Sequence, residues 1–438
     1  MDWWLILILM LIVLVVLFLS SLPVAFAFLL FNFLGIYYLM GAAGFNQLIL
    51  SIFDSLTRFS LAPVPLFILM GGVLFHSGVA ARVIDIVDKW LGRLPGRLSL
   101  LATAAGTIFA NLTGSTMANT AMMGTLLVPE MKRRGYSKPL MYGPIMAAGG
   151  LAMIIPPSAL TVILGSLSGI SIGKLLIGGF LPGFLMAALY CAYIIIRAWS
   201  RPYEAPSYEV APTPLSEKLM GVVKYMFPLA FIILAVLGTL FLGVATPTEA
   251  AALGAVACFV LAAAYGKLSV KVVKDSASSC IETTVMAFMI IAGATAFSQI
   301  MAFTGVSRSL VQVVTGANIA PILILIGMQI MLLFLGCFME QVSMMMITLP
   351  IFMPVVGALH FDPVWFGIMM LINLEIGMLT PPFGMILFVM KGVAPSDTTM
   401  TDIYKAAFPY VLLNILTIAL IMVLPPIATY LPDIMRKG

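Results

Sequence analysis

Ile155-Pro156-Pro157-Ser158 and Thr380-Pro381-Pro382-Phe383-Gly384 each contain a double proline, and the architecture expected for this chain depends on them. Each places a double proline inside otherwise apolar sequence, and a further proline, Pro129 or Pro354, precedes each pair by 27 residues. The two blocks therefore superimpose at one offset of 225 residues, about half of the 438-residue chain. Matched spacing of this kind predicts an internal repeat.

The composition is that of an integral membrane protein. Hydrophobic residues make up 62% of the chain and charged residues 9%, whereas a soluble domain carries about 25% charged residues. Apolar runs occupy residues 5–19, 24–40, 61–74, 175–196, 227–244, 250–264, 285–303, 319–338, 364–379 and 411–431. A helical span needs about 20 apolar residues, so we expect an all-α protein with roughly ten to twelve membrane-embedded helices. The alternating pattern of a transmembrane barrel is missing from the sequence.

Basic residues cluster in three loops, which orients the chain in the membrane. The clusters are Lys132-Arg133-Arg134 with Lys138, the basic residues within 197–224, and Lys267, Lys271 and Lys274. The positive-inside rule places all three in the cytoplasm, and no nucleic-acid partner is needed to explain them. Upstream, residues 82–90 have an amphipathic pattern. That segment either lies in the membrane interface or packs as a helix on the protein.

The residues that membrane-embedded enzymes use are missing from the sequence. His76 and His360 are isolated, and no His-Glu-x-x-His helix, catalytic Asp pair or Ser/His constellation is present. The cysteines have neither metal-ligand spacing nor the pattern of a disulfide framework. We therefore expect a protein that is not an enzyme.

The double prolines predict two broken helices. Proline has no N–H to bond the carbonyl four residues earlier, and an unpaired carbonyl in a membrane must be buried in protein or line a wet cavity. The carbonyls released in this way belong to Ala152, Met153, Gly377 and Met378. Broken helices at matched positions of two repeats are the best sequence indication of a transporter's ion and substrate site.

A polar stretch precedes each break and predicts the tip of a helical hairpin. In the first half, neutral oxygens come from Thr113, Ser115, Thr116 and Asn119, with Gly114 permitting a tight turn. In the second half, the corresponding residues are Glu340, Gln341 and Ser343, with Thr380 beside the break. Such oxygens suit Na⁺ rather than a soft metal. Close helix packing is the alternative explanation for any single Ser or Thr.

Two further acids have alternative interpretations. Glu375 lies six residues before Pro381 and is either a functional intramembrane acid or a satisfied structural one. Glu249 follows Thr246-Pro247-Thr248 and favours the role of a helix cap.

At these residues the chain resembles the large membrane subunit of tripartite ATP-independent periplasmic (TRAP) transporters. Thr113-Gly-Ser-Thr116 is similar to the first-hairpin Ser-Gly-Ser-Ser type motif of that family, and segments 155–158 and 377–384 resemble its two broken-helix motifs. Segments 63–71, 173–183 and 245–250 fit as well. The chain departs from the family at Ala152, where glycine is common, and at Glu340, where aspartate is frequent.

The resemblance implies an inverted-repeat secondary transporter of the elevator type, with two re-entrant helical hairpins and two broken helices, in the bacterial inner membrane. Family members take up carboxylate-bearing solutes coupled to Na⁺. They work with a small four-helix membrane subunit, expected here as a separate chain, and with a soluble periplasmic substrate-binding protein. The alternatives are a carboxylate carrier of similar hairpin architecture that needs no soluble receptor, and a passive channel.

The residue patterns and the family resemblance together predict which residues bind Na⁺ and which contact the solute. The expected Na⁺ ligands are Thr113, Gly114, Ser115, Thr116, Ala152, Ile155 and Pro157 in the first half, and Gln341, Gly377, Thr380 and Pro382 in the second. The expected solute contacts are Asn119, Ser158, Glu340, Ser343, Pro156 and Pro381.

The chain divides into six expected regions. Residues 1–97 hold N-terminal scaffold helices and the amphipathic segment, and residues 98–200 hold the first transport repeat with the break at Pro156. A proline-rich cytoplasmic linker follows in 201–224, and scaffold helices in 225–320. The second transport repeat, with the break at Pro381, occupies 321–400, and a C-terminal helix occupies 401–438.

Overall fold

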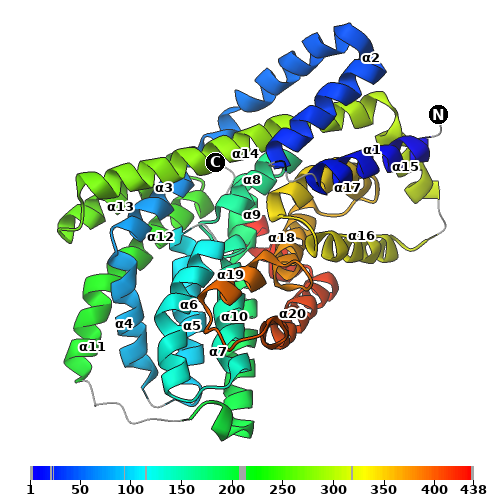
Figure 1. The fold of residues 1–438 in the computed structure, drawn as a ribbon. Coiled ribbons are helices and arrows are strands. Elements are labelled where there is room, and N and C mark those ends of the chain that lie inside the picture. The colour runs from blue at the N-terminus through cyan, green and yellow to red at the C-terminus, as the bar shows by residue number, and fades with distance from the viewer. Residues whose placement is uncertain are drawn as a thin grey trace.

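The computed structural model describes residues 3–19, 22, 24–92, 94–113, 116–206, 214–316 and 319–435. Every regular element in these ranges is a helix, so the predicted all-α class is confirmed (Figure 1). Among the described residues, seven helices are long and apolar enough to cross a membrane, and five more apolar helices are shorter. The predicted membrane protein is therefore borne out.

The first half of the chain runs from the amino terminus to the end of α10. Its elements are α1 (Trp3–Leu19), α2 (Val24–Leu56), η1 (Phe59–Leu61), α3 (Pro63–His76), α4 (Val79–Leu91), α5 (Arg97–Thr113), α6 (Thr116–Arg133), α7 (Lys138–Gly150), η2 (Leu151–Met153), α8 (Ala159–Ser168), α9 (Ile172–Gly178) and α10 (Phe180–Ser200).

The second half begins with the short turn η3 and ends at α21. Its elements are η3 (Pro202–Glu204), α11 (Leu215–Gly221), the π-helical η4 (Val222–Met226), α12 (Phe227–Phe241), α13 (Pro247–Ala264), α14 (Val270–Phe303), α15 (Val306–Gly316), α16 (Pro321–Gly336), α17 (Gln341–Ala358), α18 (Pro363–Leu379), α19 (Met385–Val393), α20 (Met400–Val423) and α21 (Pro426–Ile434). Helix α11 thus starts inside the expected linker, and two helices occupy the expected C-terminal region.

Helices α2, α3, α13 and α14 form a frame on one side of the molecule. Helix α14 has 34 residues, which at 1.5 Å per residue span about 51 Å, and Figure 1 shows it lying across this side. It packs on α2 and α3, and α13 packs on α3. The amide of Asn32 in α2 donates to the Gly293 carbonyl of α14 at 2.8 Å. Gly41, with φ 66°, interrupts α2 and redirects the chain.

Two packed helix pairs, α5 with α6 and α16 with α17, precede the two double prolines. Helix α7 ends at Gly150 and continues only as η2 before the chain bends at the first proline pair. Helix α18 ends at Leu379, and the chain turns through the second pair before α19. Both predicted helix breaks are confirmed, because proline cannot supply the amides that would continue the helix.

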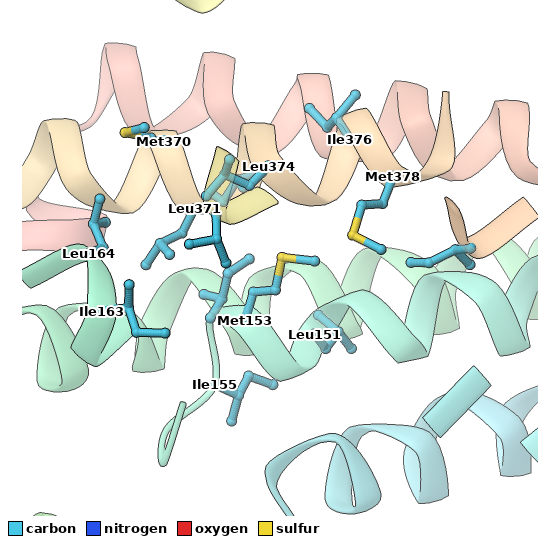
Figure 2. Close-up of a cluster of buried hydrophobic side chains, with 14 of the residues drawn as sticks. Leu151, Met153, Ile155, Ile163, Leu164, Met370, Leu371, Leu374, Ile376 and Met378 are labelled. Atoms are coloured by element: carbon cyan, nitrogen blue, oxygen red, sulfur yellow. The ribbon is translucent and has the colours of Figure 1, made fainter. Parts of the chain in front are cut away.

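Hydrophobic side chains from both halves enclose the first break (Figure 2). Met153 and Ile155 flank the bend, and they belong to the same buried cluster as Ile163 of α8 and Leu371 and Leu374 of α18. Full burial of a side chain of this kind stabilises by about 1.5–3 kcal/mol. Packing therefore holds a segment that has lost its helical hydrogen bonds.

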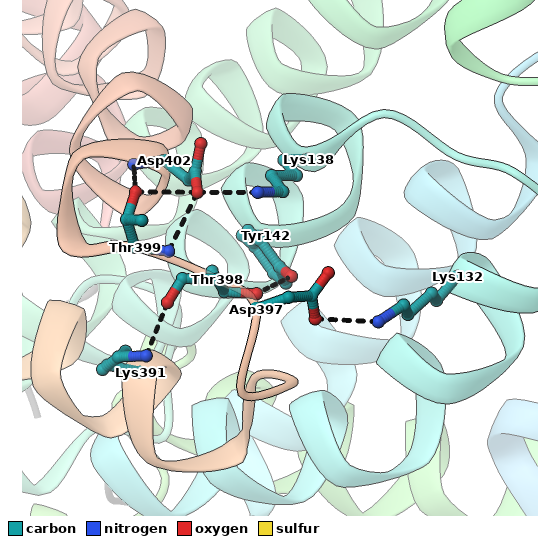
Figure 3. A network of polar contacts seen from close by, with 8 residues as sticks. All are labelled: Lys132, Lys138, Tyr142, Lys391, Asp397, Thr398, Thr399 and Asp402. Carbon is teal, nitrogen blue, oxygen red and sulfur yellow. Dashed lines mark hydrogen bonds and ion pairs between the residues drawn. The ribbon is translucent and has the colours of Figure 1, made fainter.

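A polar network ties the two halves together at the end that carries the basic loops (Figure 3). Lys132 pairs with Asp397 at 2.8 Å, and Lys138 pairs with Asp402 at 2.7 Å. The hydroxyl of Tyr142 lies 2.7 Å from that of Thr398. The hydrogen bond from Lys132 holds the pKa of the Asp397 carboxyl below its ordinary value. The start of α7 and the α19–α20 connection are thereby fixed to each other.

Two interpretations left open by the sequence are decided by packing. Helix α4 buries Val83 and Ile86 against the protein and is joined to α5 by an ion pair of 2.7 Å between Asp88 and Arg97. The helix packed on protein is therefore the better description of residues 82–90. Glu249 forms a capping box with Thr246 at the start of α13, which confirms the predicted cap.

Candidate functional site

The first break is closed by two hydroxyl groups. The hydroxyls of Ser158 and Thr161 each donate to the carbonyl of Met153 at 2.8 Å, and Ser158 Oγ also accepts from the Thr161 amide at the start of α8. Both side chains are buried. The expectation of an unpaired Met153 carbonyl is therefore wrong, because neighbouring hydroxyls satisfy it. These bonds give Ser158 a structural role at the break, and its expected contact with solute stays a prediction.

At the second break, hydrogen bonds from Thr380 and Tyr404 satisfy three other carbonyls. Thr380 donates from its hydroxyl to the Ile376 carbonyl at 2.6 Å and from its amide to the Gly377 carbonyl at 3.2 Å. The Tyr404 hydroxyl donates to the Pro382 carbonyl at 3.2 Å. The expected ligand carbonyls of Gly377 and Pro382 thus each accept one hydrogen bond and retain one lone pair.

The carbonyl of Met378 is the main difference between the two breaks. No hydrogen bond from any described residue reaches it. At the repeat offset, Phe383 and Ile386 stand where Ser158 and Thr161 stand in the first half, so the two hydroxyl donors are missing. The second break therefore leaves the Met378 carbonyl oxygen unpaired among the described residues, whereas the corresponding Met153 carbonyl at the first break accepts two hydrogen bonds.

Glycines let neighbouring helices close on each break. A Cβ on Gly179 would overlap the carbonyl of Ile154, and one on Gly183 would overlap the side chain of Ile155. At the second break, a Cβ on Gly336 of α16 would lie 2.6 Å from the Cα of Gly377. Segment 173–183, which contributed to the family resemblance, therefore packs the start of α10 directly against the first break. Pro156 and Pro157 are buried in consequence, whereas Pro381 and Pro382 are exposed.

The first hairpin tip is described only in part. Gly114, Ser115 and the side chain of Thr113 lie outside the described residues. Thr116 begins α6, is buried, and places its hydroxyl 4.0 Å from the sulfur of Met378. A residue of the first tip therefore touches the second break.

Asn119 follows one turn later and is fully buried. Its Nδ2 donates to the Gly106 carbonyl at 3.0 Å, which fastens α6 to α5. Its Oδ1 has no hydrogen-bond partner among the described residues. This unpaired oxygen can accept a hydrogen bond or bind a cation, and the expected contact of Asn119 with solute stays a prediction.

The second hairpin tip is built around Glu340. The carboxylate accepts from the amides of Val342 and Ser343 at 3.1 and 3.3 Å and from the Ser343 hydroxyl at 3.4 Å. Glu340 is thus the N-cap of α17, where a negative charge is stabilised by the helix dipole. The next residue, Gln341, is buried and donates from Nε2 to the sulfur of Met153 at 3.1 Å.

The contacts of Thr116 with Met378 and of Gln341 with Met153 are equivalent in the two repeats. Thr116 and Gln341 are 225 positions apart, and so are Met153 and Met378. The pairs Thr116 with Met378 and Gln341 with Met153 are therefore reciprocal, as a two-fold relation between repeats requires. Each hairpin tip reaches the break of the opposite repeat. Sequence reasoning predicted contacts only between each tip and the break of its own half, and it did not predict the contacts between opposite repeats.

A cavity of about 180 Å³ lies where the tips meet the frame. Thr116, Gln341 and Glu340 line it from α6 and α17, Ala159 lines it from α8, and Thr283 lines it from α14. At roughly 30 Å³ per water molecule, the volume corresponds to about six waters. The space suits a small solute.

Glu340 has the only ionisable side chain among the described residues that line this cavity. An anion held about 5 Å from the carboxylate would be repelled by roughly 3 kcal/mol at an effective dielectric constant of 20. While Glu340 is ionised, a cation beside the solute would offset this repulsion.

A buried polar cluster lies behind the breaks, and only the structure could assemble it. Glu375 is fully buried, and the Tyr190 hydroxyl lies 3.0 Å from its Oε1 and 2.5 Å from Oδ1 of Asn414. The three residues come from α18, α10 and α20. Oε2 of Glu375 and Nδ2 of Asn414 have no hydrogen-bond partner among the described residues, so this buried acid is only partly satisfied. The only sequence signal for Tyr190 and Asn414 is that each is a polar residue inside an apolar run.

Comparison with known proteins agrees with this architecture. The family described as tripartite ATP-independent periplasmic transporter, DctM component, matches residues 11–427. The C4-dicarboxylate TRAP transporter large permease protein DctM of Pseudomonas aeruginosa is 32% identical over 393 residues, 89% of this chain and 90% of that protein. The isethionate TRAP transporter permease protein DctMQ of Oleidesulfovibrio alaskensis is 34% identical over 387 residues, 87% of this chain and 58% of that longer protein.

Among solved structures, MtrF of Neisseria gonorrhoeae, of a class of antimetabolite efflux pumps, superposes with a TM-score of 0.64 at 14% identity, over 95% of this chain and 94% of MtrF. This likeness is one of fold alone. The family match and the two relatives carry the assignment. The chain belongs to the DctM component family of tripartite ATP-independent periplasmic transporters, the multi-pass large permease subunits of the inner membrane, which transport solutes and are not enzymes.

Proposed function

We propose that this chain moves a small organic anion into the cell together with Na⁺. The observation that carries the proposal is the cavity where the two hairpin tips meet the frame, which has one carboxyl group, Glu340, and no basic side chain among its described lining residues. Because an organic anion entering that space needs a compensating cation, coupling to a cation follows from the charge of the site.

The ligands for Na⁺ come from both repeats. The unpaired Oδ1 of Asn119, the hydroxyl of Thr116 and the unbonded carbonyl of Met378 are neutral oxygens, which hard cations prefer. Gly377 and Thr380 supply further oxygens at the second break. Thr113, Gly114, Ser115, Ala152, Ile155 and Pro157 stay predicted ligands of a first-half site, with Gln341 and Pro382 in the second.

The solute is a small carboxylate or sulfonate. Two relatives are named for C4-dicarboxylate and for isethionate transport, and both names denote small anions. A cavity of about 180 Å³ is of matching size. Succinate and isethionate are therefore the first two probes, and they differ in the oxyanion that the carrier must accept.

The movement is of the elevator type. The cavity lies between the paired repeats, α5–α8 and α16–α19, and the frame that contains α3 and α14. The hairpins α5–α6 and α16–α17 are re-entrant in this scheme, so that the tips meet near the membrane midplane. A displacement of the repeats along the frame carries a solute held at this boundary across the membrane.

The partners are those of the family. TRAP large permeases work with a small membrane subunit and a periplasmic binding protein, and we propose that the small subunit of this chain is a separate protein. The name DctMQ of one relative belongs to a longer protein, of which this chain covers 58%.

Uptake in proteoliposomes tests the proposal. The chain, its small subunit and its soluble receptor are reconstituted, and labelled succinate or isethionate is added outside with or without an inward Na⁺ gradient. Accumulation above the external concentration, dependent on both the gradient and the receptor, is expected. Equilibration without Na⁺ would instead indicate a passive channel. Uptake that needs Na⁺ but no receptor would indicate the receptor-independent carrier.

A further inference from the structure

A second and larger cavity, of about 370 Å³, opens at the other end of the molecule from the basic loops. Helix α14 starts beside the third basic cluster and ends at Phe303, and the cavity wall includes Ile291, Thr295 and Ala302 from its last part. Because the basic clusters mark the cytoplasm, this outer cavity faces the periplasm.

The outer cavity continues the inner one along the same three helices. On α8 the lining changes from Ile163 to Ser166, on α14 from Ala287 to Ile291, and on α17 from Val342 to Met345. Steps of three or four residues equal one helical turn, about 5.4 Å. The two cavities are therefore consecutive chambers in the groove between α8, α14 and α17.

Arg58 is the only charged residue among the described residues that line the outer cavity. Its guanidinium contacts the Asp54 carboxylate at 3.3 Å, and the two side chains are 57% and 74% exposed. An ion pair this exposed contributes little, and a second carboxylate can replace the first at low cost. Arginine also binds planar oxyanions through two parallel hydrogen bonds.

Hydroxyl groups complete the wall around this cation. They belong to Ser55, Ser166, Ser168, Thr295, Ser298 and Ser307. Four of them, Ser55, Ser166, Ser168 and Thr295, donate to carbonyls of their own helices. The chamber thus places several hydroxyl groups and one guanidinium on an otherwise apolar wall, in contrast to the inner cavity with its carboxyl group.

We propose that the outer cavity is a receiving site for the oxyanion of the solute, in which Arg58 exchanges Asp54 for the carboxylate or sulfonate. From there the solute passes along α8, α14 and α17 to the inner cavity, where the cation replaces the arginine as its partner. The inference rests on the proposed anion uptake and adds to it the place where the solute first meets the membrane subunit.

Thiol labelling tests the charge of this chamber without any transport measurement. Ser298 is exposed on the cavity wall, and Ser298→Cys is introduced into a variant of the full complex in which the four native cysteines are replaced by alanine. Labelling rates are measured with the anionic 2-sulfonatoethyl and the cationic 2-(trimethylammonio)ethyl methanethiosulfonates. Thr295→Cys serves as a second reporter on the same wall.

Arg58→Gln is expected to lower the ratio of anionic to cationic labelling rates by about fivefold. Arg133→Gln, which removes an exposed arginine from an ion pair with Glu130 at the opposite end, leaves the ratio unchanged. Succinate or isethionate slows labelling when Arg58 is present and not in Arg58→Gln. An unchanged ratio in Arg58→Gln at both reporters, or reporters inert to both reagents, overturns the inference.

Transport kinetics then separate the two proposals. Arg58→Gln raises the KM for succinate or isethionate uptake by about tenfold with little change in Vmax. Arg58→Lys keeps the charge but loses the paired hydrogen bonds, so it gives an intermediate KM, and Asp54→Asn lowers the KM. A wild-type KM in Arg58→Gln contradicts the receiving site and leaves Na⁺-coupled uptake intact. A wild-type complex that takes up neither anion refutes the proposed function, while the labelling ratio still reports on the outer cavity.

Discussion

Gly150 and Glu375 occupy the same position in the two repeats, and they pack directly against each other. The two residues are 225 positions apart, and a Cβ on Gly150 would overlap the carboxyl group of Glu375. Residues that meet their own counterparts lie on the axis that relates the repeats. The glycine in one repeat therefore leaves room for the buried acid of the other.

Gly150→Ala is expected to destabilise the protein by about 1–3 kcal/mol, because the added methyl group overpacks a site with no free volume. The melting temperature of the detergent-purified protein measures the loss. Gly357→Ala is the matched control, since nothing lies within 4 Å of a Cβ at that position. Combining Gly150→Ala with Glu375→Ala should restore part of the loss. A purely additive double variant contradicts the contact.

The two hydroxyls at the first break are expected to act together. Ser158→Ala and Thr161→Val each remove one donor from the Met153 carbonyl and should each cost about 1 kcal/mol. The double variant leaves a buried carbonyl unpaired and should cost more than the sum of the two. Thermal unfolding measures the effect. Ser200→Ala, which removes an exposed hydroxyl bonded to its own helix, is the control and should be neutral.

Asn119 is expected to set the affinity for Na⁺. Asn119→Ala removes the unpaired Oδ1 and should raise the Na⁺ concentration for half-maximal uptake by about tenfold. Thr125→Ala on the same helix, an exposed hydroxyl bonded to the Ala121 carbonyl, should leave it unchanged. The measurement is solute uptake against external Na⁺ concentration. An equal rise in both variants argues against Asn119 as a ligand.

Glu204 is expected to make stability depend on pH at the cytoplasmic end. Burial disfavours its ionised form, but hydrogen bonds from Arg197 and Arg201 outweigh this and hold the pKa of the Glu204 carboxyl below its ordinary value of 4.5. Because the folded-state pKa is lowered, the stabilisation is present above the ordinary pKa and is lost as the pH falls through the folded-state value.

Glu204→Gln should therefore lower the melting temperature at pH 7, and the difference from wild type should shrink below pH 4.5. Glu217→Gln is the control, because its ion pair with Lys89 is half exposed and contributes little at any pH. A difference for Glu204→Gln that stays constant across this range contradicts the linkage.

The helical class, the repeat offset and the two helix breaks could be predicted from residue patterns alone. Apolar runs require helices in a bilayer, because no water is present there to satisfy an exposed backbone. Each double proline withholds two successive amides, and the helices break at Pro156-Pro157 and Pro381-Pro382, whereas single prolines such as Pro144 and Pro354 stay inside their helices. The cap at Glu249 is equally local, since a capping box needs residues only three positions apart.

The sequence could not predict which carbonyl oxygens stay unpaired or which distant side chains contact each other. Met153 and Met378 are identical by sequence position in their repeats, yet hydroxyls close the first carbonyl and none reaches the second among the described residues. The contact between Gln341 and Met153 joins residues 188 positions apart. Proline chemistry acts within one turn of a helix, whereas hydrogen-bond satisfaction and cavity charge depend on side chains that folding brings together from distant segments.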